Sequence, residues 1–179
     1  MMEIENDTNI RGESICLRGL QDEDASVEYC SWINDPKVNK FLGTKKATIN
    51  ELKKYIKEKK ENKNCLFLGI FTKTSNKHIG NIKLEPIDFK NKKAILGILI
   101  GDKNYWGRGI CTETAKLVVN YAFKNLNLKR VELGVISENK AAIQCYLKAG
   151  LKIDRTGPKI KGDNGRYYKT IFMSIEKTS

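Results

Sequence analysis

The chain has 179 residues, of which 40% are hydrophobic, and its formal net charge is +12 at pH 7. This length suits one domain spanning residues 1–179, which buries about two thirds of its unfolded surface without a stabilising prosthetic group. No apolar run approaches the roughly eighteen residues of a membrane span, and the N-terminus is acidic and polar, so we expect neither a membrane anchor nor a signal peptide.

The first third of the chain predicts a strand followed by two helices. Residues 14–20 alternate as a strand does, and residues 24–33 have helical periodicity. Thr48 and Glu51 match a capping box, in which each side chain bonds the backbone of the other. We therefore expect the second helix to run from this box to about residue 62.

The middle of the chain predicts three strands and a third helix. Residues 65–72 and 79–84 read as strands around a polar turn, and residues 94–101 form the next apolar strand. A segment with two closely spaced glycines follows and leads into an amphipathic helix. The apolar side of that helix carries Ala115, Val118, Val119, Ala122 and Leu126.

The last third predicts one strand, a helix and a hairpin. Residues 130–136 form the strand, and the helix begins near Asn139. Asn164-Gly165 is a strong hairpin signal and predicts that two final strands flank it.

This element order predicts an α+β domain with four helices and a mixed, mostly antiparallel twisted sheet of about seven strands. A helical crossover joins residues 94–101 to residues 130–136, so those two strands are the expected parallel neighbours. The sequence shows neither internal repeats nor low-complexity linkers.

The glycine segment indicates an anion site. About four backbone N–H groups at a helix start lack intrahelical partners, and the helix dipole adds partial positive charge there. Gly107 and Gly109 have no Cβ to keep a phosphate from the main chain. The spacing fits neither a Walker loop nor a dinucleotide fingerprint, which would need a third glycine where Thr112 stands.

Residues 106–111 instead resemble the acyl-CoA loop of the GCN5-related N-acetyltransferase (GNAT) family, Gln/Arg-x-x-Gly-x-Gly/Ala, with Trp106 and Cys111 departing from it. The wider string "YWGRGICTE" resembles the subgroup that acetylates ribosomal-protein N-termini (RimJ/RimL-like). Residues 139–151, "NKAAIQCYLKAGL", resemble the family's Asn-x-x-Ser/Ala-x-x-x-Tyr-x-Lys-x-Gly-Phe helix. The resemblance implies the GNAT acyl-CoA N-acyltransferase fold.

The helical spacing of this second motif can be read without the family. Ala142, Cys145, Tyr146 and Ala149 recur at helical positions of one face, which places Tyr146 toward the core. Asn139 lies seven residues earlier, about 10 Å along the axis on the same face. Asn139 suits a helix N-cap and a contact to CoA, and the two roles are compatible.

The resemblance implies acetyl-CoA as a co-substrate and a direct attack on its thioester by a primary amine. Tyr146 is then the general acid, and backbone N–H groups near Ile98 and Leu99 stabilise the oxyanion. The expected contacts to acetyl-CoA are Ile98, Leu99, Ile100, Trp106, Gly107, Arg108, Gly109, Ile110, Cys111, Thr112 and Asn139.

The residues that receive the amine are less clearly marked. Glu85, at the end of a strand, is a candidate general base, as is a chain of water molecules or an amine that arrives neutral. His78, the only histidine, is expected on the surface of a polar turn. Trp32 and Tyr168 are candidate acceptor contacts, and Trp32 also suits a core position.

The five cysteines, at positions 16, 30, 65, 111 and 145, are odd in number and widely spaced. This spacing predicts no zinc or other metal site, no disulfide framework and a cytoplasmic location. The charge of +12 suits a solvated lysine-rich surface, capture of polyanionic CoA, or contacts with RNA, the ribosome or an acidic acceptor.

The leading hypothesis is an N-acetyltransferase that modifies a protein N-terminus or a small-molecule amine, as a monomer or homodimer. One alternative acceptor is a nucleotide-linked amino sugar of surface-glycan synthesis, which residues 78–110 also resemble. The other alternative is a catalytically weak CoA-binding or ribosome-binding module.

Overall fold

The computed structural model describes residues 8–161 and 165–178 of the chain. Four α-helices lie in this described part: α1 Val27–Asn34, α2 Ile49–Glu61, α3 Ile110–Lys124 and α4 Lys140–Lys148. Eight strands accompany them: β1 Asn9–Arg11, β2 Ile15–Gly19, β3 Leu66–Thr72, β4 His78–Asp88, β5 Lys93–Ile100, β6 Arg130–Ile136, β7 Lys152–Lys161 and β8 Tyr167–Glu176. Short 3-10 turns occupy Asp22–Asp24, Asn39–Phe41 and Lys103–Tyr105.

The strands form one sheet in the order β1-β2-β3-β4-β5-β6-β8-β7. All neighbours pair antiparallel except β5 and β6, so the predicted parallel pair is confirmed. The sheet has eight strands rather than about seven. The additional strand is β1, whose three residues are too few to show an alternating pattern in the sequence.

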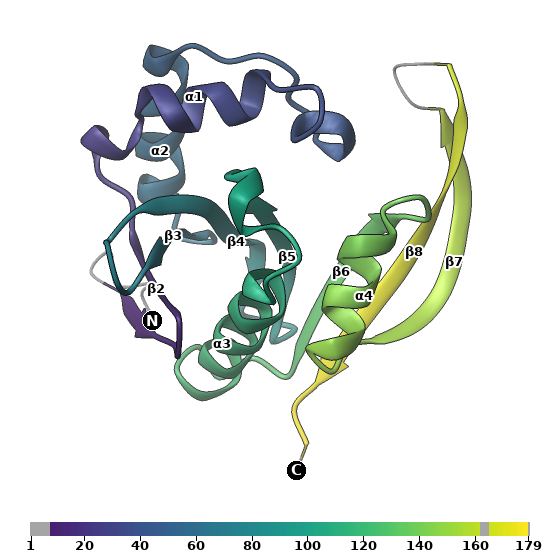
Figure 1. The fold of residues 1–179 in the computed structure, drawn as a ribbon. Coiled ribbons are helices and arrows are strands. Elements are labelled where there is room, and N and C mark those ends of the chain that lie inside the picture. Colours follow the sequence, from purple (N-terminus) through teal and green to yellow (C-terminus); the bar gives the residue numbers. More distant parts are fainter. Residues whose placement is uncertain (1–7, 162–164, 179) are drawn as a thin grey trace.

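The sheet opens where β5 and β6 meet. The two strands pair only at Lys93 with Arg130, Ala94 with Val131 and Ile95 with Glu132. β6 then continues along β8 as far as Ile136, while β5 continues along β4 as far as Ile100. Figure 1 shows the two halves of the sheet diverging from this short contact, with α3 beside one half and α4 beside the other.

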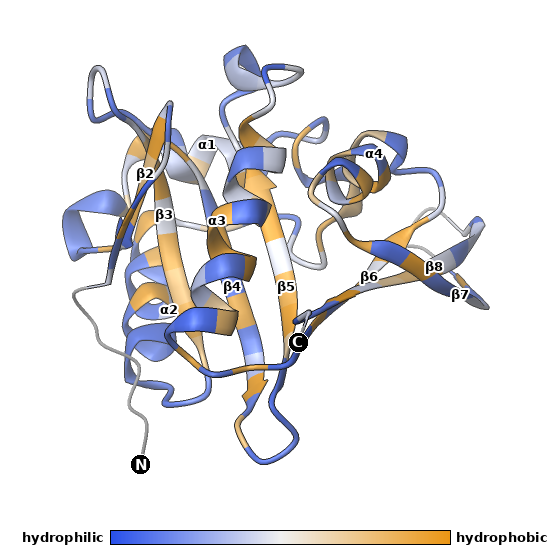
Figure 2. Cartoon of the chain, turned by 90° about the horizontal axis from the view of Figure 1, so that it is seen from below, coloured by the Kyte–Doolittle hydropathy of each residue, from blue (hydrophilic) through white to orange (hydrophobic). Residues whose placement is uncertain are grey.

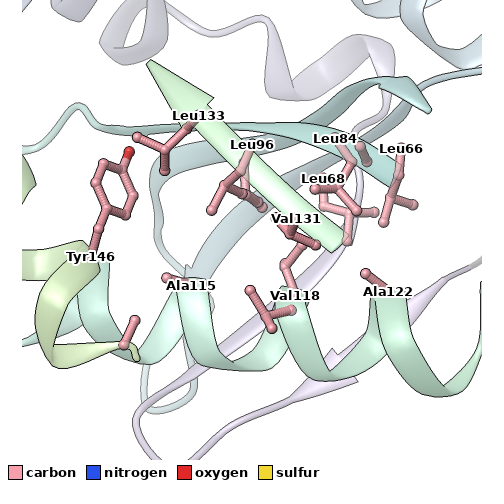
Figure 3. Close-up of a cluster of buried hydrophobic side chains, with 14 of the residues drawn as sticks. Leu66, Leu68, Leu84, Leu96, Ala115, Val118, Ala122, Val131, Leu133 and Tyr146 are labelled. Atoms are coloured by element: carbon pink, nitrogen blue, oxygen red, sulfur yellow. The ribbon is translucent and has the colours of Figure 1, made fainter. Parts of the chain in front are cut away.

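Helices cover both faces of the β2–β5 part of the sheet (Figure 2). The predicted apolar side of α3 is buried against one face, where Ala115, Val118 and Ala122 are fully enclosed by strand side chains (Figure 3). On the other face, α1 and α2 form a second cluster that includes Tyr29, Trp32 and Leu52. The sheet thus separates two apolar layers, and the opening beside β5 lies between them.

Local capping explains where the first two helices begin. The predicted capping box of α2 is confirmed, since the Thr48 N–H donates to Glu51 Oε2 at 2.7 Å and the Glu51 N–H donates to Thr48 Oγ1 at 3.3 Å. Helix α1 starts at Val27 rather than near residue 24, because Ser26 Oγ accepts the Tyr29 N–H at 3.1 Å and fixes the cap there.

The hairpin at the end of the chain agrees with the predicted turn. β7 and β8 pair antiparallel, from Lys152 with Ser174 to Lys161 with Tyr167. Gly165 has φ +76°, the left-handed geometry that favours glycine in such turns. Asn164, the other residue of the predicted turn, lies outside the described residues.

Candidate active site

The glycine segment forms an open helix start, as predicted. Gly107 and Gly109 have φ of +72° and +78°, and Gly109 is the N-cap of α3 without any side chain capping it. The first intrahelical bond runs from the Glu113 N–H to the Gly109 carbonyl at 3.0 Å. The N–H groups of the three preceding residues therefore have no intrahelical acceptor: Ile110, Cys111 and Thr112.

The side chains around this loop leave its backbone accessible. A Cβ added at Gly107 or Gly109 would meet nothing within 4 Å. Trp106 is 44% exposed, and its indole Nε1 donates to the Ile100 carbonyl at 2.8 Å. Arg108 is exposed, with its guanidinium carbon 5.6 Å from the centre of the Tyr105 ring. This combination of open amides and a nearby cation suits a diphosphate.

The expectation that the cysteines form no disulfide is wrong at one pair. Cys111, in the first turn of α3, is bonded to Cys145, in the last turn of α4, with their Cα atoms 5.9 Å apart. The two residues are 34 positions apart, and only the packing of α3 beside α4 brings them together. The bond directs the Cys111 side chain toward α4. Among described residues Cys16, Cys30 and Cys65 remain free thiols.

The backbone of β5 presents Ile98 to the opening. The Gly101 N–H donates to the Ile79 carbonyl at 2.9 Å, so these residues form a hydrogen-bonded pair of the antiparallel ladder. Such pairs alternate along the ladder. The Leu99 N–H consequently points toward β4, whereas the N–H groups of Ile98 and Ile100 point toward β6. No residue of β6 pairs with β5 beyond Ile95 in the described chain.

Tyr146 lies on the inner face of α4, as predicted. It is 6% exposed and belongs to the main apolar cluster, against which Ile98 and Ile100 also pack. Figure 3 shows its ring beside Leu133 of β6, with the hydroxyl directed away from α3. Burial raises the pKa of the Tyr146 hydroxyl to about 12, so this group carries its proton at neutral pH.

Asn139 is the N-cap of α4, one of the two roles predicted for it. Its Oδ1 accepts the Ala142 N–H at 3.3 Å. Near the other end of α4, the Thr112 hydroxyl donates to the Cys145 carbonyl at 3.5 Å and so joins the start of α3 to the end of α4. These contacts place the motif residues of α3 and α4 side by side.

The carboxylate of Glu85 is bound by two lysine side chains. Lys59 Nζ lies 2.6 and 2.7 Å from its two carboxylate oxygens, and Lys83 Nζ lies 3.0 Å from one of them. Burial opposes ionisation, but the hydrogen bonds from Lys59 and Lys83 outweigh it and hold the pKa of Glu85 below its ordinary value. A carboxylate stabilised in this way is a weak proton acceptor.

His78 is not on the surface of a polar turn, contrary to the prediction. It begins β4 opposite Phe71, and its ring centre lies 4.8 Å from that of Phe71 and 5.1 Å from that of Trp32. Its Nε2 lies 3.0 Å from the Gly80 carbonyl and 2.9 Å from Asn81 Oδ1. His78 pairs with Phe71 in the sheet, and this pairing places its ring among aromatic side chains. The polar residues next to it in the sequence gave no sign of this.

A cavity of about 650 Å³ lies between α1–α2 and the face formed by β3 to β5. Its wall includes Ile98, so it reaches the open part of β5 from the side opposite α3. Trp32 is 7% exposed and packs in the second apolar cluster. The described cavity wall includes neither Trp32 nor Tyr168, a half-buried residue of β8.

Comparison with known proteins agrees with this geometry. A family model described as an acetyltransferase (GNAT) domain matches residues 14–152. The chain belongs to the GNAT family. It is accordingly an acetyl-CoA-dependent N-acetyltransferase, and among curated proteins it is 29% identical to the uncharacterized N-acetyltransferase p20 of Bacillus licheniformis, over 74% of this chain and 75% of that protein.

Solved GNAT structures share the fold. The spermidine N-acetyltransferase of Vibrio cholerae in complex with CoA and spermine has a TM-score of 0.82 at 21% identity, covering 91% of this chain and 95% of that one. The microcin C7 self-immunity acetyltransferase MccE in complex with acetyl-CoA and AMP has a TM-score of 0.80 at 25% identity, covering 92% and 93%.

The described residues were also compared with the requirements of a membrane-spanning helix and of a metal site. In residues 8–161 and 165–178, no helix has both the length and the apolar character needed to cross a membrane. The same residues hold no group of three or more His, Cys, Asp or Glu side chains that could bind a metal ion.

Proposed function

We propose that the protein transfers the acetyl group of acetyl-CoA directly to a primary amine, either of a small molecule or of a protein N-terminus. The observation that carries this proposal is the position of Ile98. Its main chain faces the opening between β5 and β6, with the open start of α3 on one side and the cavity under α1–α2 on the other. Donor and acceptor can therefore meet from opposite faces of the sheet.

The start of α3 is the proposed diphosphate site. The N–H groups of Ile110, Cys111 and Thr112 donate to phosphate oxygens, and Gly107 and Gly109 let the phosphates approach the backbone. Trp106 and Arg108 border this site, and Asn139 lies at the start of the adjacent helix. The disulfide between α3 and α4 fixes the spacing of the two helices around the pantetheine arm.

The Ile98 N–H is the proposed oxyanion donor. Of the three β5 residues expected to contact acetyl-CoA, Ile98 and Ile100 direct their N–H groups toward the opening, and Leu99 uses its own in the ladder with β4. An N–H held by a strand needs no reorganisation when negative charge develops on the thioester oxygen. Losing one such donor commonly lowers the rate about 10² to 10³-fold.

Tyr146 is the proposed proton donor to the thiolate leaving group. Its buried hydroxyl stays protonated, and its position on α4 beside Leu133 puts it on the CoA side of the opening. The neutral amine attacks the thioester carbon, the C–S bond of the tetrahedral intermediate then breaks, and the Tyr146 proton passes to sulfur. The proton that the nitrogen loses as the amide forms leaves through water, and water returns a proton to Tyr146.

The amine must also lose a proton before it attacks, because an alkyl ammonium has a pKa of about 10.4. Glu85, clamped by Lys59 and Lys83, is poorly suited to accept it. Those same lysines line the cavity and disfavour a further positive charge there. They would lower the pKa of a bound amine, which supports proton loss to water before attack.

The sequence motif supports a narrower placement within the family. The string from Tyr105 to Glu113 favours the subgroup that acetylates ribosomal-protein N-termini. We also propose that the chain forms one domain, since all described strands belong to one sheet.

Incubation of the purified protein with acetyl-CoA and a panel of amines tests the proposal. Release of the CoA thiol, with a matching gain of one acetyl group on the amine by mass spectrometry, is the expected result. Tight acetyl-CoA binding without transfer to a small amine, a peptide or a 4-amino sugar nucleotide would instead favour a non-catalytic CoA-binding module.

A further inference from the structure

The cavity under α1–α2 carries more positive than negative side chains. Among the described residues of its wall, three lysines face a single glutamate: Lys46, Lys59, Lys83 and Glu51. Glu51 is already engaged at the start of α2, where its carboxylate accepts the Thr48 N–H at 2.7 Å and the Thr48 hydroxyl at 2.9 Å. Both hydrogen bonds go to Glu51 Oε2, and this one carboxylate of the described wall does not offset the charge of three lysines.

The remaining nearby carboxylate does not balance the lysines. Glu85 binds both Lys59 and Lys83, so one negative charge serves two positive charges. Lys83 Nζ also lies 3.4 Å from the Tyr55 hydroxyl. An ammonium group has three N–H donors, so Lys83 retains a donor beyond these two contacts.

Asn81 adds a neutral donor to the same wall. It is 4% exposed, and its Nδ2 is buried without a hydrogen-bond partner in the protein. His78 Nε2 lies within 3.0 Å of the Gly80 carbonyl, which can only accept, so Nε2 carries the proton and donates also to Asn81 Oδ1. The amide oxygen is thereby occupied and the NH₂ group is left without an acceptor.

The two residues bracket the reacting position. Asn81 and Lys83 share one face of β4, roughly 7 Å apart along the strand. Their partners on β5 are Leu99 and Gly97, the residues on either side of Ile98. The Lys83 stem lies beside Gly97, where an added Cβ would be in ordinary contact with Lys83 Cγ at 3.6 Å.

We propose that the amine acetylated by this enzyme carries a negatively charged, oxygen-rich group, a carboxylate or a phosphate, which Lys83 and Asn81 bind beside Ile98. This inference rests on the proposed acetyl transfer and narrows its acceptor. A polyamine brings only cations and N–H donors, and this wall offers it one carboxylate, Glu51, against three lysines. An anionic amine supplies the oxygen acceptors that Lys83 and Asn81 lack.

Equilibrium binding to the CoA-loaded protein tests the inference without requiring turnover. Isothermal titration with 4-aminobutanoate, 3-aminopropyl phosphate, butylamine and 1,4-diaminobutane compares chains of similar length that differ in the far group. We expect at least one anionic amine to bind at least tenfold more tightly than the diamine and the neutral chain. Within the series, 4-aminobutanoate and 3-aminopropyl phosphate distinguish a carboxylate from a phosphate as the preferred group, and an added uridine-diphosphate 4-amino sugar tests a nucleotide-linked acceptor.

Variants locate the selectivity. Lys83→Met keeps the aliphatic stem, removes the charge and should weaken the preferred anionic amine at least fivefold. Asn81→Asp replaces the donor by a carboxylate and should shift the preference toward the diamine. Lys57→Met, on the exposed side of α2, removes the same charge away from the cavity and should leave all affinities unchanged.

Two results would overturn the inference: a diamine or neutral amine that binds as well as both anionic amines, or an anion preference that Lys83→Met and Lys57→Met reduce equally. Failure of the proposed function looks different. Selective binding of an anionic amine without acetyl transfer to it would reject the chemistry and retain the charge selectivity of the cavity.

Discussion

The indole Nε1 of Trp106 donates a hydrogen bond of 2.8 Å to the carbonyl of Ile100. This bond joins the glycine loop to the open end of β5. Ile100 turns its main chain away from β4, as Ile98 does, so the indole uses a carbonyl that the sheet leaves unpaired. The bond thereby couples the proposed diphosphate site to the strand that holds the proposed oxyanion donor.

Replacing Trp106 by phenylalanine should weaken acetyl-CoA binding by roughly 3 to 10-fold. The variant keeps an aromatic ring but loses one hydrogen bond, whose net contribution is about 1 kcal/mol. Titration of CoA into the purified variant measures the effect. Tyr167→Phe, on an exposed residue of β8, serves as the aromatic control, and an unchanged CoA affinity in Trp106→Phe would show that the bond does not order the loop.

Replacing Gly109 by valine should abolish detectable CoA binding. Gly109 has φ +78°, so a β-branched residue is strained there, and its side chain would enter the space proposed for the phosphates. Gly165→Val is the matched control, because Gly165 has φ +76° and open space around it, far along the chain on the β7–β8 hairpin. Both variants should lose stability, and only Gly109→Val should lose CoA. Retained affinity would reduce the loop to a turn.

The sequence was sufficient for the fold because its signals are local and agree with one another. The capping box at Thr48, the apolar side of α3 and the crossover from β5 to β6 each depend on short-range patterns, and all were confirmed. The open start of α3 followed from two glycines alone. The three-residue strand β1 was missed because it is shorter than any periodic pattern.

The parts of the site that the sequence could not supply depend on contacts between distant elements. The Cys111–Cys145 bond requires knowing that α3 and α4 pack side by side. Glu85 read as a candidate base until Lys59, from α2, was seen to bind it. His78 looked solvated because its neighbours in the chain are polar, whereas its neighbours in space are aromatic.

The position of His78 makes stability fall as the pH drops below about 6.5. Burial lowers the pKa of His78, against the opposing effects of its bond to Asn81 and of the Asp24 charge. Between the lowered pKa and the ordinary value of about 6.5, the unfolded chain binds a proton that the folded chain excludes. Urea unfolding at pH 7.5 and 5.5 should therefore show a lower free energy of unfolding at the acidic pH.

The chain has one histidine, so an imidazole signal can be assigned to His78 without ambiguity. His78→Gln should reduce the decrease between pH 7.5 and 5.5, and an NMR titration of the single imidazole should give its folded pKa directly. A folded pKa at or above the ordinary value would contradict the buried, aromatic surroundings.

Removing the disulfide should lower stability without removing the fold. A bridge that closes a loop of 34 residues contributes about 3 to 4 kcal/mol in the chain-entropy description. The double variant Cys111→Ala/Cys145→Ala should lose roughly 2 to 4 kcal/mol in urea unfolding. Reductant should bring the wild type to a similar midpoint and leave the double variant unchanged; a wild-type midpoint insensitive to reductant would mean that the bond does not form.

Replacing Tyr146 by phenylalanine should lower kcat at least tenfold. General acid–base catalysis commonly contributes a factor of about 10² to 10⁴. The ring remains in the apolar cluster beside Leu133, so CoA affinity and the urea midpoint should change little.

Because burial raises the pKa of Tyr146 to about 12, its hydroxyl keeps the proton through the alkaline range in which enzymes are normally assayed. The kcat of the wild type should therefore not fall through ionisation of Tyr146 at any pH up to about 10. Tyr167→Phe, 63% exposed on β8, should retain full turnover. If Tyr146→Phe turns over as fast as the wild type, the proton on the leaving sulfur comes from another group, and Tyr146 is a core residue of α4.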